Sequence, residues 1–236
     1  HFDISTKQIS FHEHNAKEKI PDLIDFLKAG QSIAQVSDAG LPSISDPGHD
    51  LVKAAIEEDI AVVTVPGASA GISALIASGL APQPHIFYGF LPRKSGQQKQ
   101  FFESKKDYPE TQIFYESPHR VADTLENMIE VYGDRSVVLV RELTKIYEEY
   151  QRGHITELLD SIAEIPLKGE CLLIVEGASQ EVEDKDEEDL FAEIQARLQQ
   201  GIKKNQAIKE VAKIYKWNKS QLYAAYHEWE DNQFND

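Results

Sequence analysis

The alternation of apolar and polar positions along this 236-residue chain predicts strands that alternate with helices. Short apolar runs bounded by glycine, proline or charged residues indicate strands buried in a sheet. Apolar residues spaced three and four apart indicate amphipathic helices. We expect strands at residues 33–37, 60–65, 85–90, 136–141 and 170–175, and a further strand at the start of segment 111–120. An antiparallel segment is expected at 148–152, and residues 8–12 are one more possible strand. Helices are expected around 20–27, 49–58, 70–78 and 155–162.

Two loops that follow expected strands are candidates for a ligand site. SDAGLPSISDPG follows strand 33–37, and PGASAG follows strand 60–65. In open α/β folds, loops at the carboxyl ends of strands bind ligands, because small residues and helix N-termini expose backbone N–H groups there. We expect Asp46 to cap the helix after the first loop, with Pro47 at its first position. The alternative is that both loops only shape tight crossovers.

Charged residues gather around the later strands. Arg93 and Lys94 lie in the basic segment LPRK, and Glu116, His119 and Arg120 lie within a few residues at the end of a strand. A carboxylate, an imidazole and a guanidinium together suit acid–base or anion-binding chemistry, although a structural ion pair at the next helix explains them as well. Lys145 is a candidate base only if burial lowers its pKa.

The composition excludes several classes of protein. A net charge of −16 argues against a general nucleic-acid binder, and no apolar run is long enough to span a membrane. The single cysteine, Cys171, excludes an internal disulfide and fits a reducing cytoplasm. The pair His12 and His14 lacks a third ligand, so no metal site is expected.

The end of the chain is expected to form a separate helical domain. An acidic run, EVEDKDEED, precedes three amphipathic segments that are rich in lysine, including Lys203 and Lys204. Short helices joined by a turn are typical of a helix-turn-helix unit, which contacts nucleic acid or mediates dimer contacts. The expected domains are an N-terminal α/β subdomain at 1–80, a second α/β subdomain at 81–178, an acidic linker at 179–189 and a helical domain at 190–236.

Five strings, in order and spread along the chain, carry a resemblance to a known family. SDAGLPSISDPG, PGASA, GFLPRK, FYESPHR and RELTKIYEEYQRG resemble the small-subunit ribosomal RNA methyltransferase I family of the tetrapyrrole methylase superfamily. The resemblance implies two α/β subdomains with a cleft between them, S-adenosylmethionine as cofactor, and methylation of a cytidine 2′-hydroxyl in ribosomal RNA. Members usually begin with a further strand and glycine-containing loop, so we expect this chain to be truncated at its front.

Site residues follow from this resemblance position by position. The resemblance also implies a cytoplasmic enzyme that acts on ribosomal RNA within the small subunit, and the chemistry of the residues adds candidates for proton transfer. A homodimer is expected because C2 pairs are common among such enzymes. The implied residues are Asp38, Ala39, Gly40, Leu41, Ser69, Ala70, Phe114 and Tyr115 for the cofactor, Glu116 or Lys145 as base or orienting group, and Arg93, Lys94, Arg120, Lys203 and Lys204 for RNA.

Two rival functions stay open at this level. A methylase that acts on a small tetrapyrrole would share the ligand site, but it would have little use for the basic segments and the lysine-rich tail. A non-catalytic module that senses a nucleotide would bind its ligand at the same loops without turnover.

Overall fold

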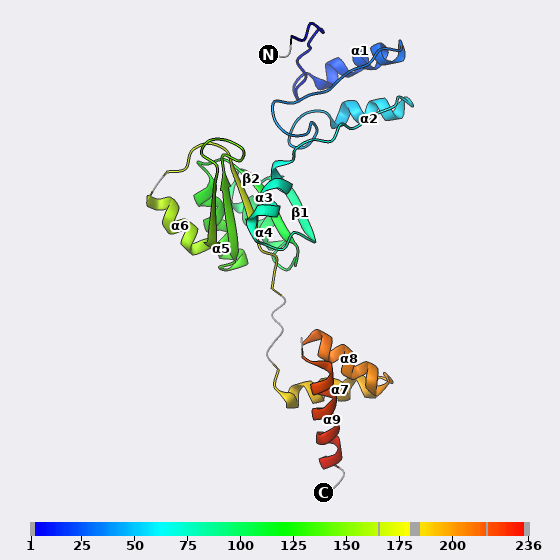
Figure 1. Cartoon of the computed structure of the whole chain (residues 1–236), viewed down its shortest axis with the longest axis vertical. Helices are drawn as coiled ribbons and strands as arrows, with labels where there is room; N and C mark the ends of the chain where they lie inside the picture. The colour runs from blue at the N-terminus through cyan, green and yellow to red at the C-terminus, as the bar shows by residue number, and fades with distance from the viewer. Residues whose placement is uncertain (1–2, 165, 180–184, 216, 234–236) are drawn as a thin grey trace. The chain divides into compact units, whose positions relative to one another are not determined.

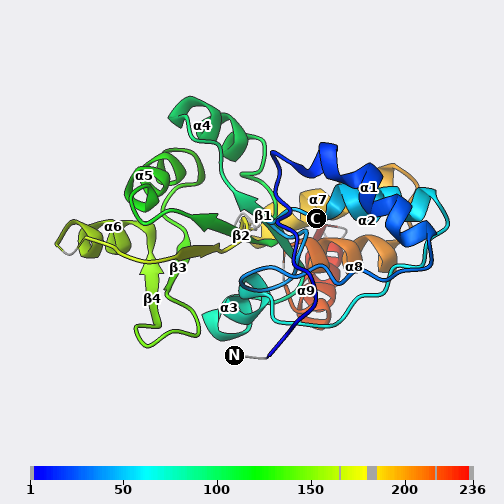
Figure 2. The same ribbon diagram turned by 90° about the horizontal axis from the view of Figure 1, so that it is seen from above.

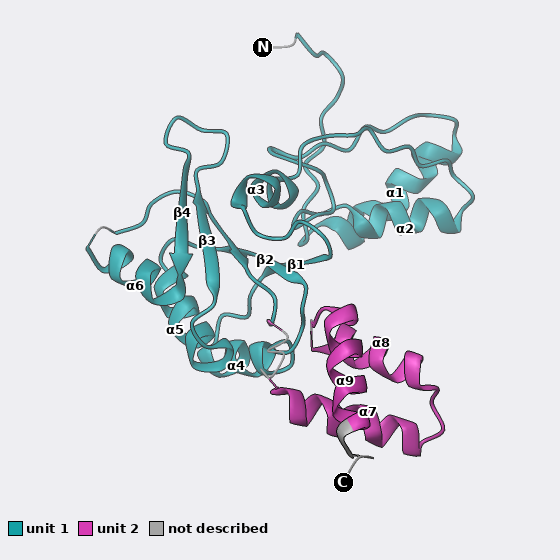
Figure 3. Cartoon of the chain, turned by 60° about the horizontal axis from the view of Figure 1, so that its bottom comes forward, with its two compact units in different colours: residues 1–178 teal, residues 179–236 magenta. Residues whose placement is uncertain are grey.

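The computed structural model describes residues 3–164, 166–179, 185–215 and 217–233 and falls into two units. The first unit is His1–Ala178 and the second is Ser179–Asp236 (Figure 3). Each has a hydrophobic core of its own and is described by itself.

A mixed five-stranded sheet forms the centre of the first unit (Figure 1). Its two neighbouring strands β1 and β2 are parallel, whereas β2–β5, β5–β3 and β3–β4 are antiparallel pairs. Parallel neighbours bring their carboxyl ends to the same edge of the sheet. The strand order is β1 (His85–Phe90), β2 (Thr111–Glu116), β5 (Cys171–Val175), β3 (Ser136–Arg141) and β4 (Glu149–His154), which confirms the five strands expected in this half of the chain.

Helices cover both faces of this sheet, because successive side chains of a strand point to opposite faces. Phe114 and Leu173 face the core beneath α4 (Ser95–Glu103), α5 (Val121–Tyr132) and α6 (Ile155–Glu164). Their chain neighbours Ile113 and Ile174 pack instead against α3 (Ala70–Ser78), on the opposite face (Figure 2). Burial on both faces explains why these strands read as nearly continuous apolar runs.

The N-terminal part of this unit differs from the expectation. Helices α1 (Ala16–Lys28) and α2 (His49–Glu57) pack against each other through Ile24 and Leu51. The strands expected at 8–12, 33–37 and 60–65 do not form among the described residues. Val36 and Val63 are 84% and 85% exposed. β-Branched residues favour a strand, but a strand also needs a hydrogen-bonded neighbour and a covered face. Segments 33–37 and 60–65 lack both the neighbour and the covered face here.

The fold class is therefore confirmed, while one helix start is corrected. The mixed sheet with helices on both faces is the expected α/β architecture, although no sheet forms within 3–80. Helix α2 begins at His49 with Gly48 as its N-cap, so Asp46 does not cap it and Pro47 is not its first residue. Gly48 has a φ of 152°, a backbone conformation that the Asp–Pro signal does not predict.

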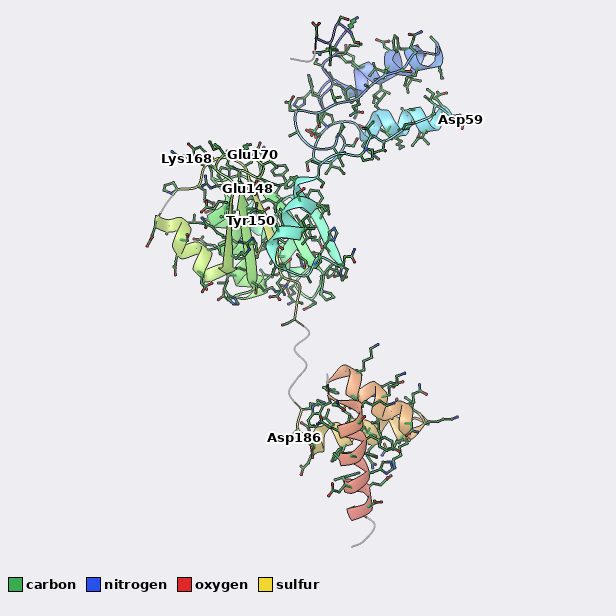
Figure 4. All side chains as sticks on the ribbon, viewed as in Figure 1. Asp59, Glu148, Tyr150, Lys168, Glu170 and Asp186 are labelled. Carbon is green, nitrogen blue, oxygen red and sulfur yellow. The ribbon has the colours of Figure 1, made fainter. Side chains whose placement is uncertain are left out.

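In the second unit, the described residues form a bundle of three helices. These are α7 (Glu187–Gln199), α8 (Lys204–Ile214) and α9 (Lys219–Gln233), and Leu190, Ile208 and Tyr226 lie in their shared core. Asp186, labelled in Figure 4, caps α7 by accepting a hydrogen bond from the Asp189 amide. Most of the expected acidic linker, 180–184, lies outside the described residues. Of the helices described, none has the length and apolar character needed to cross a membrane.

Candidate functional site

The two loops singled out in the sequence lie against each other. We call residues 38–48 the first loop and residues 66–69 the second loop. A Cβ atom added at Gly40 would lie 3.5 Å from the Ala68 carbonyl oxygen, and one at Gly67 would lie 3.1 Å from Leu41 Cδ2. Gly40 has a φ of 69°, which favours glycine, and a side chain at Gly67 would press on that of Leu41. Two loops far apart in sequence form one surface.

Hydrogen bonds at its base hold the first loop in shape. The Gln35 side-chain amide donates to the Pro47 carbonyl oxygen at 2.7 Å, which ties the two ends of the loop together. The Ser37 hydroxyl donates to the Ala39 carbonyl oxygen at 3.1 Å. Between these anchors, Asp38 is exposed, together with the two residues after it. Asp38, Ala39 and Gly40, three of the expected cofactor positions, are thus accessible.

Helix α3 starts at the second loop and points its first turn at Tyr115 of β2. Ser69 is the N-cap, and its side chain makes no capping hydrogen bond. The backbone of Gly71 lies close to the Tyr115 hydroxyl. Burial raises the pKa of Tyr115, the nearby Asp46 carboxylate raises it further, and the Gly71 backbone amide opposes both. Tyr115 is therefore a neutral donor at the helix N-terminus, beside the first loop.

The end of β1 completes this site. The register of β1 shifts between Phe87 and Gly89, and Gly89 has a φ of 69°. A Cβ atom at Gly89 would lie 3.5 Å from the hydroxyl oxygen of Ser45 in the first loop. Phe90 is 61% exposed, and its ring centroid lies 5.5 Å from that of Tyr115. The first loop, the second loop and the ends of β1 and β2 therefore converge.

Phe114 does not present its side chain to this site. It is fully buried on the opposite face of the sheet, where its ring stacks on Tyr88 at 5.4 Å and packs against Phe101 and Phe102. Only its backbone is placed to meet a ligand near Tyr115.

Glu116 lies in a closed environment at the end of β2. Its side chain has no exposed surface. Its carboxylate accepts hydrogen bonds from the Ser117 amide at 2.8 Å and the Thr124 hydroxyl at 2.9 Å, and it pairs with Arg120 at 3.3 Å. A carboxylate with three protein partners and no accessible surface cannot reach a substrate directly. The structure contains the ion pair between Glu116 and Arg120, which is the structural alternative to acid–base chemistry.

Lys145 has the opposite environment. It is exposed, and its ammonium donates to Glu142 at 3.0 Å and to Glu170 at 2.9 Å. These hydrogen bonds raise its pKa, first through Glu170 and then through Glu142. Glu170 is labelled in Figure 4 at the end of the sheet where β4 begins. Lys145 is thus held as a cation, and the lowered pKa that a general base requires is not produced by these neighbours.

The residues expected to contact RNA fall into free and engaged groups. Arg93 and Lys94 are exposed in the loop after β1, and Lys203 is exposed before α8. Arg120 donates to the carbonyl oxygens of Leu91 and Pro92. Lys204 pairs with Glu230 of α9 and lies over the Tyr226 ring, so its charge is used within the bundle.

Several contacts at the site had no signal in the sequence. Gly71 and Tyr115 are far apart in the chain, as are Gly89 and Ser45. For Phe90, the sequence pattern predicts only a place in strand 85–90. The converging segments offer glycine backbone, free hydroxyl groups and aromatic rings, which together suit a ligand that carries polar groups on a flat ring. Among the residues described, no group of three His, Cys, Asp or Glu side chains is arranged to hold a metal ion.

A family model places the chain among methylases, and a solved structure shares its fold. The family model of Tetrapyrrole (Corrin/Porphyrin) Methylases matches residues 1–159. A crystal structure of diphthine synthase superposes with a TM-score of 0.56 at 14% sequence identity, covering 72% of this chain and 68% of that chain. At that identity the likeness concerns the fold alone.

Relatives of much higher identity define the family further. The Ribosomal RNA small subunit methyltransferase I of Streptococcus pyogenes serotype M1 is 70% identical over 230 residues, which cover 97% of this chain and 80% of the relative. The protein of the same name from Bacillus subtilis strain 168 is 44% identical over 231 residues, covering 96% and 79%. The chain therefore belongs to the ribosomal RNA small subunit methyltransferase I family of the tetrapyrrole methylases, which confirms the resemblance seen in the sequence.

Proposed function

We propose that this protein transfers a methyl group from S-adenosylmethionine to the 2′-hydroxyl of a cytidine in small-subunit ribosomal RNA. The observation that carries the proposal is the 70% identity, over nearly the whole chain, to a relative named for methylation of small-subunit ribosomal RNA. The convergence of the first and second loops with the ends of β1 and β2 supports it, since ligands in open α/β folds bind at that edge of the sheet.

The cofactor would be held by the backbone of Asp38, Ala39, Gly40 and Leu41 and by Ser69 and Ala70 at the start of α3. Tyr115 and the backbone of Phe114 would form the third side. These residues fit such a group, because Gly40 and Gly67 leave room for backbone contacts and the Ser69 hydroxyl makes no capping bond. When bound, S-adenosylmethionine supplies a methyl group activated by its sulfonium.

The chain's own residues would position the ribose for an in-line attack. Alignment supplies much of the acceleration in such a transfer, because the leaving thioether is neutral and needs no acid. The attacking oxygen passes its proton to solvent water as its bond to the methyl carbon forms, and a positive charge close by would offset negative charge that develops on that oxygen. We assign Lys145 to orienting the ribose and offsetting the charge on its oxygen, since Glu142 and Glu170 hold it as a cation.

Local positive charge would dock the RNA on a protein of net charge −16. Arg93, Lys94 and Lys203 are exposed, and none of them forms an ion pair with another described residue. The same holds for Lys209, Lys213 and Lys219 on α8 and α9. Each phosphate contact releases counterions, so affinity for small ribosomal subunits should fall as salt rises.

We further propose a cytoplasmic homodimer. The exposed Ile214 and Tyr223 give the second unit apolar surface for such a contact. Size-exclusion chromatography with multi-angle light scattering distinguishes the monomer of 26.6 kDa from its dimer. The double variant Ile214→Ala/Tyr223→Ala should be a monomer.

Calorimetric titration with S-adenosylmethionine tests the cofactor site. Wild type should bind, and the variant Gly40→Val/Ser69→Leu should lose binding because its side chains fill the space between the loops. Gly30→Val is the matched control, since Gly30 also has a positive φ but no atom within 4 Å of an added Cβ. Loss of binding in the control as well would show that backbone strain, and not the site, is responsible.

Methyl transfer assays then separate the rival functions. Incorporation of labelled methyl groups into small ribosomal subunits, at a cytidine 2′-hydroxyl, is the expected result. Transfer to a tetrapyrrole but not to subunits would favour the small-molecule methylase. Binding without turnover on either substrate would favour the sensing module.

A further inference from the structure

The loop that carries Arg93 and Lys94 is held by one buried side chain, that of Gln98, and one partly exposed side chain, that of Arg120. Arg120 donates to the Pro92 carbonyl oxygen at 2.7 Å and to the Leu91 carbonyl oxygen at 3.3 Å. Gln98 of α4, which is 3% exposed, donates to the same Pro92 oxygen at 2.9 Å. Both backbone carbonyls that precede Arg93 are therefore fixed by side chains from elsewhere in the fold.

A second layer of buried polar groups fixes these two side chains. Thr124 connects them, because its hydroxyl donates to Glu116 at 2.9 Å and accepts from Gln98 at 3.3 Å. Glu116 in turn pairs with Arg120. Asn127 donates to Gln98 at 2.8 Å and accepts from the Ser95 hydroxyl at 2.7 Å. The loop is thus tied at both ends, before Arg93 and just after Lys94.

This network costs more to bury than apolar side chains of the same size would. Buried polar groups must each find a partner, and a satisfied network adds little net stability compared with apolar packing. What it adds is a single geometry, because each member restricts the rotamers of the next. All these bonds converge on one loop, and that loop ends in two free cations.

We propose that the network of buried Gln98, Glu116, Thr124 and Asn127 with half-buried Arg120 is a positioning device that holds residues 91–94 so that Arg93 and Lys94 meet phosphates of the RNA substrate. This inference rests on the proposed function, whose substrate is RNA. It makes Glu116 and Arg120 positioning residues, in place of a base and a phosphate ligand. Gln98, Thr124 and Asn127 join them without touching substrate.

A matched pair of glutamines provides the test. Gln98 and Gln112 are both buried in the first unit, but Gln112 bonds Lys105 and Tyr132, away from the loop. Gln98→Met should raise KM for small ribosomal subunits about five- to tenfold, with kcat and the affinity for S-adenosylmethionine nearly unchanged. Both variants should lower the thermal midpoint of unfolding to a similar extent. Gln112→Met should nevertheless leave KM unchanged. Gln98→Glu keeps an acceptor for Asn127 but cannot donate to the Pro92 carbonyl oxygen, so it should not recover the loss.

A double-mutant cycle shows whether the effect passes through the two cations. Arg93→Ala/Lys94→Ala should raise KM by itself. Adding Gln98→Met to that variant should raise KM no further, because the network would have nothing left to position. Additive effects would overturn the proposal, as would equal KM values for Gln98→Met and wild type.

Failure of the proposed function is distinguishable from failure of this inference. If wild type does not methylate small subunits, hydrogen exchange of backbone amides in residues 93–97 still decides the positioning role. Faster exchange there in Gln98→Met but not in Gln112→Met supports it. Equal exchange in the two variants overturns it.

Discussion

At the residue scale, Gly177 is a position where one added methyl group should destabilise the first unit. A Cβ atom there would collide with the backbone of Pro109 and Glu110, which cannot move aside as a flexible side chain can. The next residue, Ala178, donates to the Tyr108 carbonyl oxygen at 2.7 Å and holds the two segments together. Gly177→Ala should therefore lower the free energy of unfolding by about 2 kcal/mol.

Gly96 is the control for that change. It lies in α4, and nothing lies within 4 Å of an added Cβ. Gly96→Ala should raise the free energy of unfolding by about 0.5 kcal/mol, because alanine loses less backbone entropy in a helix. Urea titrations of both variants measure the two effects, and a neutral Gly177→Ala would mean that segments 108–110 and 177 separate easily.

Lys145 should affect turnover through its charge. Lys145→Met removes the cation beside Glu142 and Glu170, so we expect kcat for small subunits to fall by about tenfold, equivalent to ~1.4 kcal/mol. Because the pKa of Lys145 is raised, the charge persists to higher pH than for an ordinary lysine, and activity should not increase as Lys145 loses its proton. Lys168→Met, at another exposed lysine near the same end of the sheet (Figure 4), should leave kcat unchanged.

The roles of these side chains could not be predicted from sequence. Glu116 and Lys145 both occur next to strand ends in polar segments, and each suits a base by residue type alone. Their environments are set by Thr124 and Glu170, which strand and helix packing brings in from other elements. Sequence patterns give the edge of the sheet where chemistry is expected, but burial and hydrogen-bond partners come from tertiary contacts.

At the scale of elements, helices and paired strands followed their sequence patterns closely, and the N-terminal extended segments did not. Helix α3 spans Ala70–Ser78 as the pattern predicts, and β3 spans Ser136–Arg141. Apolar runs at 33–37 and 60–65 show the same β-branched composition without forming strands. The difference is pairing: β3 has neighbours on both sides, whereas the two segments have none among the described residues.

Arg152 of β4 joins two elements that the sequence does not connect. Its guanidinium donates to the Ala77 carbonyl oxygen at 2.7 Å and to the Ser78 carbonyl oxygen at 3.0 Å, at the C-terminus of α3. A cation there satisfies free carbonyl groups and interacts favourably with the helix dipole. Arg152→Met should lower the free energy of unfolding by about 1–2 kcal/mol. Arg152→Lys should lose less, and equal stability of all three proteins would contradict this role.

At the scale of the whole molecule, the chain has two cores that can be observed separately. Both tryptophans, Trp217 and Trp229, lie in the second unit, and Trp229 packs against Phe191 and Tyr226. Tryptophan fluorescence therefore reports unfolding of the three-helix bundle, while far-ultraviolet circular dichroism reports both units. Two transitions should appear where the stabilities of the units differ.

Acid should destabilise the second unit through Glu193. Its carboxylate accepts from Lys185 at 3.1 Å and pairs with Arg197, and these bonds lower its pKa to about 2. A lowered pKa means that the folded state binds the proton less readily than the unfolded state. The stabilisation is therefore complete above the ordinary pKa near 4.5 and is lost as pH falls from there towards 2.

Glu193→Gln should reproduce that loss at neutral pH. We expect the free energy of unfolding at pH 7, followed by tryptophan fluorescence, to fall by about 1 kcal/mol or less because the pair is partly exposed. The unfolding midpoint should fall with it. Below pH 3 the variant and wild type should converge, since wild-type Glu193 is then increasingly protonated. Glu228→Gln, an exposed residue on α9, is the control and should leave the midpoint unchanged at both pH values. A difference between Glu193→Gln and wild type that persists undiminished below pH 2 would show that packing, and not charge, is responsible.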